Sequence, residues 1–170
     1  MASNTLFNNL DEFDVVHINS EFADQDSDHD PSVARFTLPQ YVGTQKNDTF
    51  TGTDLNEVIT GGFGGDRLTG GGGSDRFVYT NIEDSGDRIE DFITGTDKIV
   101  LTQLLNSLVP GGYNGTNAIA DGYVQLVQRG GKVVLQINQD GFGDDNRFRN
   151  YITVENVLAA DLSALNNFVF

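Results

Sequence analysis

The sequence contains no cysteine and no tryptophan, and it has only three prolines and two histidines among its 170 residues. Without cysteine the chain can form neither a disulfide nor a thiolate metal site, and two histidines are too few for a histidine-rich transition-metal site. Basic residues are also scarce, because 10 lysines and arginines stand against 25 aspartates and glutamates, for a net charge of -15. This charge argues against nucleic acid or an anionic membrane as a partner and indicates a cation instead.

Long apolar runs and catalytic motifs are absent as well. No segment approaches the roughly 18 apolar residues of a membrane helix, so we expect no membrane insertion. The N-terminal stretch MASNTLFNNLDEF has neither a basic region nor an apolar core, so we do not expect a cleavable secretory signal there. The chain has no HExxH or GxSxG motif and no paired nucleophile and base, so we expect no enzymatic activity.

Glycine, by contrast, is concentrated in one place, because eight of the thirteen residues at 61–73 are glycines. Glycine loses more conformational entropy on folding than other residues, so a folded protein retains such a run where the backbone needs positive φ or approaches a ligand closely. A flexible linker would be rich in glycine too. The regular spacing described next favours an ordered structure.

From residue 43 the chain divides into four blocks of nine: GTQKNDTFT, GTDLNEVIT, GGFGGDRLT and GGGGSDRFV. The first position is always glycine, the eighth is always apolar, and the sixth is always acidic, as Asp48, Glu57, Asp66 and Asp75. A period of nine fits neither a helix nor an array of hairpins. It suits a loop of six residues followed by a strand of three.

These loops have the chemistry of a hard cation site. The apolar residue in the middle of each strand would point inward, because side chains alternate. The glycines permit turns and expose peptide carbonyls, and the acidic sixth residue would point back into the concave side. Calcium prefers about six to eight oxygen ligands, of which one loop supplies about half, so a second stacked loop would complete the shell.

The blocks GGFGGDRLT and GGGGSDRFV match G-G-x-G-x-D-x-U-x, where U is a large apolar residue, and resemble the repeats-in-toxin (RTX) calcium-binding nonapeptides. The resemblance implies an all-β fold, a right-handed parallel β-roll in which two nonapeptides make one turn and ions lie between repeats n and n+2. It therefore implies one row of sites with Asp48 and Asp66 and a second with Glu57 and Asp75. The first two blocks depart from the pattern at positions 2 and 4.

The following segment, RFVYTNIEDSGDRIEDFITGTDKIVL, resembles the closing segment of RTX proteins such as serralysin-type proteases and alginate-epimerase R-modules. On this resemblance, Asp87 and Asp91 of DRIEDF are the final calcium ligands. The complete set of candidate ligands, contributing carboxylate or backbone carbonyl oxygens, is Asp48, Glu57, Gly61, Phe63, Gly65, Asp66, Gly70, Gly72, Ser74, Asp75, Asp87 and Asp91.

The chain thus divides into an N-terminal capping segment that is partly an acidic linker (1–42), the nonapeptide repeats (43–78) and a β-rich C-terminal cap with short helices (79–170). Within the cap, GYVQLVQRGGKVVLQINQD predicts a hairpin that turns at 129–131 and is followed by a polar loop and another strand. The leucines of VLTQLLNSLV have helical spacing and indicate core packing; they are Leu101, Leu104, Leu105 and Leu108. The end, DLSALNNFVF, resembles the uncleaved export signal that type I secretion systems read, although a terminal β-strand has the same pattern.

Two further acidic stretches have plainer interpretations. DQDSDHDP at 24–31 has the alternating aspartates of an EF-hand loop but lacks its glycine and its final glutamate, which favours a solvated linker over an irregular ion site. NQDGFGDDN could hold an ion through Asp140, Asp144 and Asp145, but a polar loop is the simpler interpretation. His17, in the alternating DVVHI, is expected to lie in a strand without a ligand role.

These features predict a non-enzymatic calcium-binding module that folds on binding calcium and supports type I secretion of an extracellular or cell-surface protein, such as an adhesin or surface-layer protein. Each repeat has few apolar residues and many carboxylates, so hydrophobic burial alone cannot offset the lost entropy, and ion binding would supply folding free energy. Two alternatives are a carbohydrate-binding accessory module, with cell-surface glycans as partners, and the C-terminal domain of a secreted hydrolase or epimerase.

Overall fold

The computed structural model describes residues 13–17, 32–36, 38–140 and 147–170, with side chains from residue 38 onward. Contacts divide the chain into two units, Met1–Pro39 and Gln40–Phe170. In the first, strands β1 (Phe13–His17) and β2 (Ser32–Phe36) pair antiparallel. The expected strand at His17 is present, whereas DQDSDHDP, Asp144 and Asp145 lie outside the described residues.

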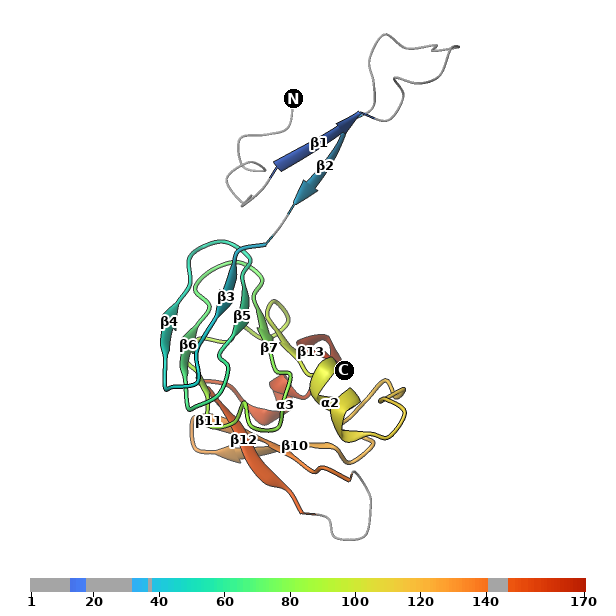
Figure 1. The fold of residues 1–170 in the computed structure, drawn as a ribbon. Helices are drawn as coiled ribbons and strands as arrows, with labels where there is room; N and C mark the ends of the chain where they lie inside the picture. Colours follow the sequence, from blue (N-terminus) through green and yellow to red (C-terminus); the bar gives the residue numbers. More distant parts are fainter. Residues whose placement is uncertain (1–12, 18–31, 37, 141–146) are drawn as a thin grey trace. The chain divides into compact units, whose positions relative to one another are not determined.

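The second unit begins with seven very short strands that alternate between two sheets (Figure 1). One sheet contains β3 (Gln40–Val42), β5 (Val58–Thr60), β7 (Arg76–Val78) and β9 (Lys98–Val100). The other contains β4 (Thr49–Thr51), β6 (Arg67–Thr69) and β8 (Arg88–Ile89). Each pairs in parallel with the next strand but one, so that Tyr41 lies opposite Ile59 and Phe50 opposite Leu68. Two nonapeptides therefore make one turn, and the predicted parallel β-roll is confirmed.

The middle residue of each strand forms the core of the roll. Side chains alternate along a strand, so each triplet sends its central apolar residue between the two sheets. The completely buried members of this stack are Ile59, Leu68, Phe77, Ile89 and Ile99. At the first turn Tyr41 and Phe50 stack with ring centroids 4.1 Å apart. Because β3 belongs to this ladder, the roll begins at Gln40 and not at Gly43.

The C-terminal segment extends both sheets. Strands β10 (Val124–Arg129) and β11 (Lys132–Ile137) form the predicted hairpin. Strand β12 (Arg149–Glu155) pairs antiparallel with β11 and parallel with β8, which joins the hairpin to the roll. Strand β13 (Phe168–Val169) pairs in parallel with β9 and extends the other sheet.

The helices are short. Helix α2 (Thr102–Leu108) has the predicted helical position, and Leu101, Leu104 and Leu105 are completely buried beside the roll. Helix α3 (Ala159–Leu162) and the 3-10 helix η1 (Leu165–Asn167) lead into β13. Within the described segments, no helix has the length and apolar character needed to cross a membrane.

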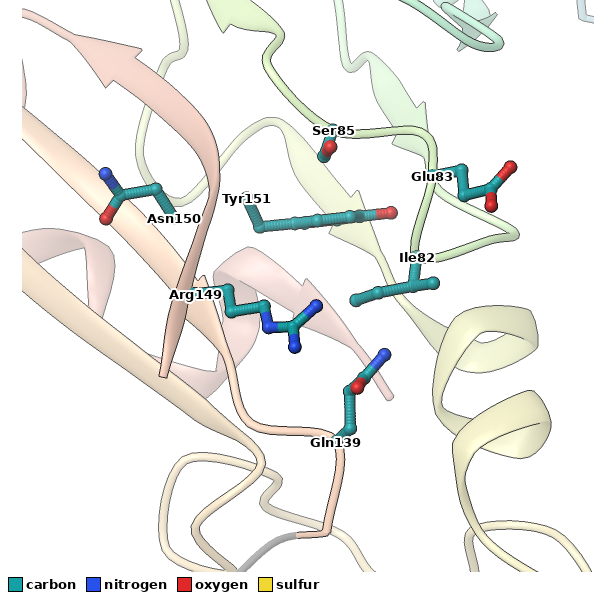
Figure 2. Close-up of a pocket in the computed structure, with 7 residues that line it drawn as sticks. All are labelled: Ile82, Glu83, Ser85, Gln139, Arg149, Asn150 and Tyr151. Atoms are coloured by element: carbon teal, nitrogen blue, oxygen red, sulfur yellow. The ribbon is translucent and has the colours of Figure 1, made fainter. Parts of the chain in front are cut away.

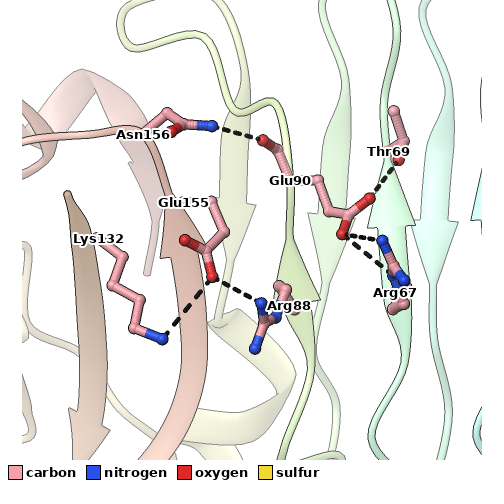
Figure 3. A network of polar contacts seen from close by, with 7 residues as sticks. All are labelled: Arg67, Thr69, Arg88, Glu90, Lys132, Glu155 and Asn156. Carbon is pink, nitrogen blue, oxygen red and sulfur yellow. Dashed lines mark hydrogen bonds and ion pairs between the residues drawn. The ribbon is translucent and has the colours of Figure 1, made fainter.

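Charged side chains connect the roll to the hairpin across one sheet (Figure 3). Arg67 on β6 contacts Glu90 at 2.7 Å. Beside this pair, Glu155 on β12 contacts Arg88 on β8 at 3.1 Å and Lys132 on β11 at 3.9 Å. Such partly exposed ion pairs contribute at most about 1 kcal/mol each, so they support a register that the buried core already sets.

Candidate metal centre

The four acidic sixth residues and two aspartates of the closing segment lie in the loops that precede the short strands, and they form two rows of three carboxylates. The first row contains Asp48, Asp66 and Asp87, and the second contains Glu57, Asp75 and Asp97. In the first row the main-chain N–H of Asp48 donates to Oδ1 of Asp66 at 2.7 Å, and that of Asp66 to Oδ1 of Asp87 at 2.9 Å. Asp66 and Asp87 thus each use one oxygen to hold the loop of the preceding turn.

The second row repeats this arrangement. The N–H of Glu57 donates to Oδ1 of Asp75 at 2.9 Å, and the N–H of Asp75 donates to Oδ1 of Asp97 at 3.0 Å. A backbone donor therefore sets the position of each carboxylate. The implied pairing of Asp48 with Asp66 and of Glu57 with Asp75 agrees with the geometry, although no calcium role follows from it alone.

The second oxygen of four of these carboxylates has no hydrogen-bond partner among the described residues. These atoms are Oε2 of Glu57 and Oδ2 of Asp66, Asp75 and Asp87, and all four side chains are at most 3% exposed. A buried polar atom without a partner costs free energy, and most such atoms in proteins are paired. Four of them in a regular array point to a ligand that the protein atoms do not supply.

The glycines at position 1 keep the space in front of these oxygens open. A methyl group on Gly61 would contact Oδ2 of Asp66 and would lie 2.8 Å from Oδ2 of Asp87. A methyl group on Gly70 would likewise contact Oδ2 of Asp75. The two carboxylates of the first row therefore converge on a space that no side chain can occupy.

Glycines at positions 2 and 4 of the complete repeats are required by the backbone. Gly62, Gly64, Gly71 and Gly73 all have positive φ, between 89° and 112°. This left-handed conformation is strained for other residues. At Gly62 a Cβ would also come 2.5 Å from the carbonyl oxygen of Thr44 in the neighbouring turn. Both turn geometry and close stacking thus explain the glycine run.

The first two blocks hold their acidic residue differently. Thr44 donates from both its main-chain N–H and its hydroxyl to Oδ2 of Asp48, at 2.7 Å each. Thr53 donates in the same way to Oε1 of Glu57. The hydrogen bonds from Thr44 lower the pKa of Asp48. Threonine at position 2 therefore satisfies Oδ2 of Asp48, whereas Glu57 keeps an unpaired Oε2 although Thr53 donates to its Oε1.

Burial raises the pKa of several carboxylates in the two rows. It is the main cause that brings the pKa of Asp75 and that of Asp87 to about 7, and neighbouring carboxylates act in the same direction. The pKa values of Asp66 and Asp97 are also raised, chiefly by burial. A cation between facing carboxylates would favour their ionised forms.

Two further residues of the closing segment bear on the site. Asp91 belongs to neither hydrogen-bonded row, but its carboxylate oxygens accept the main-chain N–H groups of Gly70 and Gly71 at 2.8 Å each, and, besides burial, its charge helps to raise the pKa of Asp97. It fixes the start of the last glycine loop. Sequence reasoning missed Asp97, which completes the second row and also accepts the N–H of Ile93 at 2.8 Å. The D-x-U triplet at 97–99, which repeats that of the nonapeptides, could have identified it.

The donor set fits a hard cation. In the described part of the chain, no three His, Cys, Asp or Glu side chains gather into a metal cluster. Each site instead offers paired carboxylates, so peptide carbonyls would have to supply the remaining oxygens. Mixed carboxylate and carbonyl ligation is typical of calcium.

The fold and the paired carboxylates define an RTX-type calcium-binding β-roll. The family described as peptidase M10 serralysin C terminal matches residues 33–156, and the chain belongs to this family. The resemblance seen in the nonapeptides is therefore confirmed.

The chain is also similar to two solved structures of subunits from the Azotobacter vinelandii mannuronan C5-epimerase. The AlgE6R3 subunit is 30% identical, with a TM-score of 0.51, and the match covers 78% of this chain and 77% of that one. The AlgE6R2 subunit is 25% identical, with a TM-score of 0.52, covering 78% and 92%. Curated proteins gave no match.

A separate pocket of about 470 Å³ lies at the start of β12 (Figure 2). Its lining consists of Ile82, Glu83, Ser85, Gln139, Arg149, Asn150 and Tyr151. In Figure 2 the side chains of Arg149 and Gln139 point toward each other beneath the ring of Tyr151. The lining is mostly polar, with Ile82 and the ring of Tyr151 as its apolar parts.

Proposed function

We propose that this chain is a module of a secreted protein that folds when it binds calcium. The observation that carries the proposal is the array of buried carboxylate oxygens that face glycine-lined spaces and have no hydrogen-bond partner in the described part of the chain. Calcium would lie between stacked loops, with Asp66 and Asp87 in one row and Glu57, Asp75 and Asp97 in the other. Backbone carbonyls would complete the shell, with Gly61, Phe63, Gly65, Gly70, Gly72 and Ser74 as candidates.

The energetics of the roll support calcium-dependent folding. Each strand of the roll contributes one central apolar side chain, while the chain as a whole carries a net charge of -15. Burying facing carboxylates without a counter-ion opposes folding, and ordering the glycine loops costs conformational entropy. Calcium would remove the repulsion and pair the unsatisfied oxygens, so its binding free energy becomes folding free energy.

Such coupling suits export through a type I secretion apparatus. Where calcium is scarce, the chain would remain unfolded and could be threaded, and it would fold outside, where calcium is plentiful. The C-terminal DLSALNNFVF is the candidate export signal. On this proposal the protein is extracellular or attached to the cell surface, and the module itself has no catalytic role.

A calcium titration of chelator-treated protein, followed by far-UV circular dichroism with magnesium as the control cation, tests the folding proposal. We expect a cooperative gain of β-structure with calcium and no comparable change with magnesium. A chain that keeps its β-structure in chelator and does not respond to calcium would refute it.

A second candidate function is binding of a carbohydrate as an accessory module. The pocket with Arg149, Gln139 and Tyr151 favours it, as does the similarity to subunits of a mannuronan epimerase. The strong negative charge disfavours an acidic polysaccharide. Calorimetric titration of the calcium-loaded protein with mannuronan oligosaccharides, compared with Arg149→Ala, tests this function, and an absence of heat in the unaltered chain would exclude mannuronan as the ligand.

A further inference from the structure

Tyr79, which directly follows β7, has a buried hydroxyl group that lacks a hydrogen bond of ordinary geometry. The residue is 1% exposed, and its oxygen finds no such partner in the described segments. Buried tyrosines usually pair their hydroxyl, because leaving it unpaired costs the lost solvation. The position of Tyr79 therefore needs an explanation beyond packing.

The hydroxyl of Tyr79 lies close to the charge of Asp87, the carboxylate that ends the first row. Burial is the main cause that raises the pKa of Tyr79, and the charge of Asp87 is the next. Oδ2 of Asp87 is itself buried and unpaired, while Oδ1 accepts the N–H of Asp66. An unused donor and an unused acceptor thus lie near each other inside the protein.

Two other polar side chains of this region have hydrogen-bond partners of their own. Tyr151 packs against Tyr79 edge to face with ring centroids 5.5 Å apart, but the Tyr151 hydroxyl donates to the carbonyl of Asn81 at 2.6 Å. Asp84 accepts the N–H and hydroxyl of Thr80 and the N–H of Asn81. Asp87 and Asp66 both act on the Tyr79 hydroxyl through their charge, but of these two carboxylates only Asp87 lies within hydrogen-bonding reach of it.

The carboxylates that end the two rows also differ in the backbone N–H groups that they accept. Asp97, at the end of the second row, accepts backbone N–H groups on both oxygens, from Asp75 and from Ile93. Asp87 has a backbone donor on Oδ1 only. A second donor would hold the plane of its carboxylate, and the Tyr79 hydroxyl is close enough to Asp87 to be that donor.

We infer that Tyr79 is a positioning residue of the calcium site between Asp66 and Asp87, an inference that rests on the proposed calcium binding. In the calcium-bound protein its hydroxyl donates to Oδ2 of Asp87 and fixes the direction in which this carboxylate faces Asp66. A carboxylate oxygen has two lone pairs, so Oδ2 can accept this hydrogen bond and still contact a cation.

The test compares Tyr79→Phe with Tyr113→Phe in the full chain. Both variants lose one hydroxyl that faces an aspartate, but Tyr113 donates to Asp121 outside the two rows, at 2.6 Å. The calcium midpoint of folding by far-UV circular dichroism should rise about tenfold for Tyr79→Phe, the effect of losing one charge-assisted hydrogen bond. Tyr113→Phe should keep the midpoint of the unaltered chain.

Tyr79→Phe keeps the aromatic ring, so a packing role alone would leave the calcium midpoint unchanged. Near-UV absorption gives a second readout, because the chain has no tryptophan and the band belongs to tyrosine. A phenol that donates to a carboxylate absorbs at longer wavelength, so the shift on calcium binding should become smaller in each variant and should disappear in neither.

The outcomes distinguish the positioning role of Tyr79 from the proposed calcium-dependent folding. An unchanged midpoint and shift in Tyr79→Phe, or a variant that does not fold at any calcium concentration, would overturn the positioning role. If the unaltered chain showed no change in circular dichroism with calcium, the proposed function would be overturned instead.

Discussion

The main-chain N–H of Asp75 donates to Oδ1 of Asp97 at 3.0 Å, although 22 residues separate the two in the sequence. The bond sets one carboxylate directly beneath another in the next turn. It explains how a roll with strands of three residues keeps its register, because the side chain of each turn holds the backbone of the turn before it. It also brings like charges together, so a cation between them would stabilise the ionised carboxylates.

Replacing Asp75 by asparagine should separate these two effects. Asparagine can still accept the N–H of Glu57 through its Oδ1, so the tie between the turns remains. The charge that would bind calcium is lost. We expect the calcium midpoint of folding, measured by circular dichroism, to rise at least about tenfold. Asp161→Asn, at an exposed position in α3, is the control and should keep the original midpoint. Equal midpoints for the two variants would argue against calcium at Asp75.

Gly61→Ala should block the first-row site without straining the turn. Gly61 does not have positive φ, so alanine fits its backbone, but the new methyl group would meet the free oxygens of Asp66 and Asp87. Calcium affinity by calorimetry should fall, and the folded state at saturating calcium should lose stability. Gly131→Ala is the matched control, because a Cβ there has no neighbour within 4 Å. Its stability should stay within about 0.5 kcal/mol of the unaltered chain. If the Gly61→Ala chain bound calcium with unchanged affinity, calcium would not occupy the space beside Gly61.

The pH dependence of the calcium-free protein follows from the raised pKa values of Asp75 and Asp87, about 7 each. Aspartate in an unfolded chain has a pKa of about 3.9, so between these values the folded state holds more protons than the unfolded state. Its stability must then fall as pH rises through this window. Without calcium we expect more β-structure at pH 5 than at pH 8, and with calcium the apparent affinity should increase over the same range. The pKa of Asp48 is lowered, so its protonation affects stability only at pH values below this window.

Circular dichroism in calcium-depleted buffer across pH 5 to 8 checks this expectation. Substituting asparagine for both Asp75 and Asp87 should weaken the dependence, since no proton is then taken up at either site, while Asp66 and Asp97, whose pKa values are also raised, would retain part of it. A calcium-free chain that gains structure as pH rises would contradict the assignment of buried, protonated carboxylates.

The sequence predicted the roll and most of its carboxylates because the repeat is regular there. Glycine, an acidic residue and an apolar residue recur every nine positions, and the structure pairs Asp48 with Asp66 across 18 residues. Beyond β7 the loops lengthen, and the corresponding separations become 21 and 22 residues. Counting in nines therefore passed over Asp97, whereas Asp87 and Asp91 were predicted from the resemblance of DRIEDF to the closing segment of RTX proteins. The placement of Tyr79 beside Asp87 could not be predicted either, because it depends on how the closing segment folds over the last turn.

Asn167 offers a test of how the C-terminal end is attached. It is completely buried, its Oδ1 accepts the N–H of Gly95 at 2.6 Å, and its amide donates to the carbonyls of Asp161 and Leu162 at 2.9 and 3.1 Å. Asn167→Ala would leave these groups unpaired in the interior, so we expect a loss of about 2–4 kcal/mol in the free energy of unfolding at saturating calcium. Asn166→Ala, at an exposed neighbouring position, is the control. Thermal unfolding of both variants measures the difference. Because β13 pairs with β9 directly after Asp97, the same loss should appear as a higher calcium requirement for folding, and an unchanged requirement would mean that the C-terminal end folds independently of the second row.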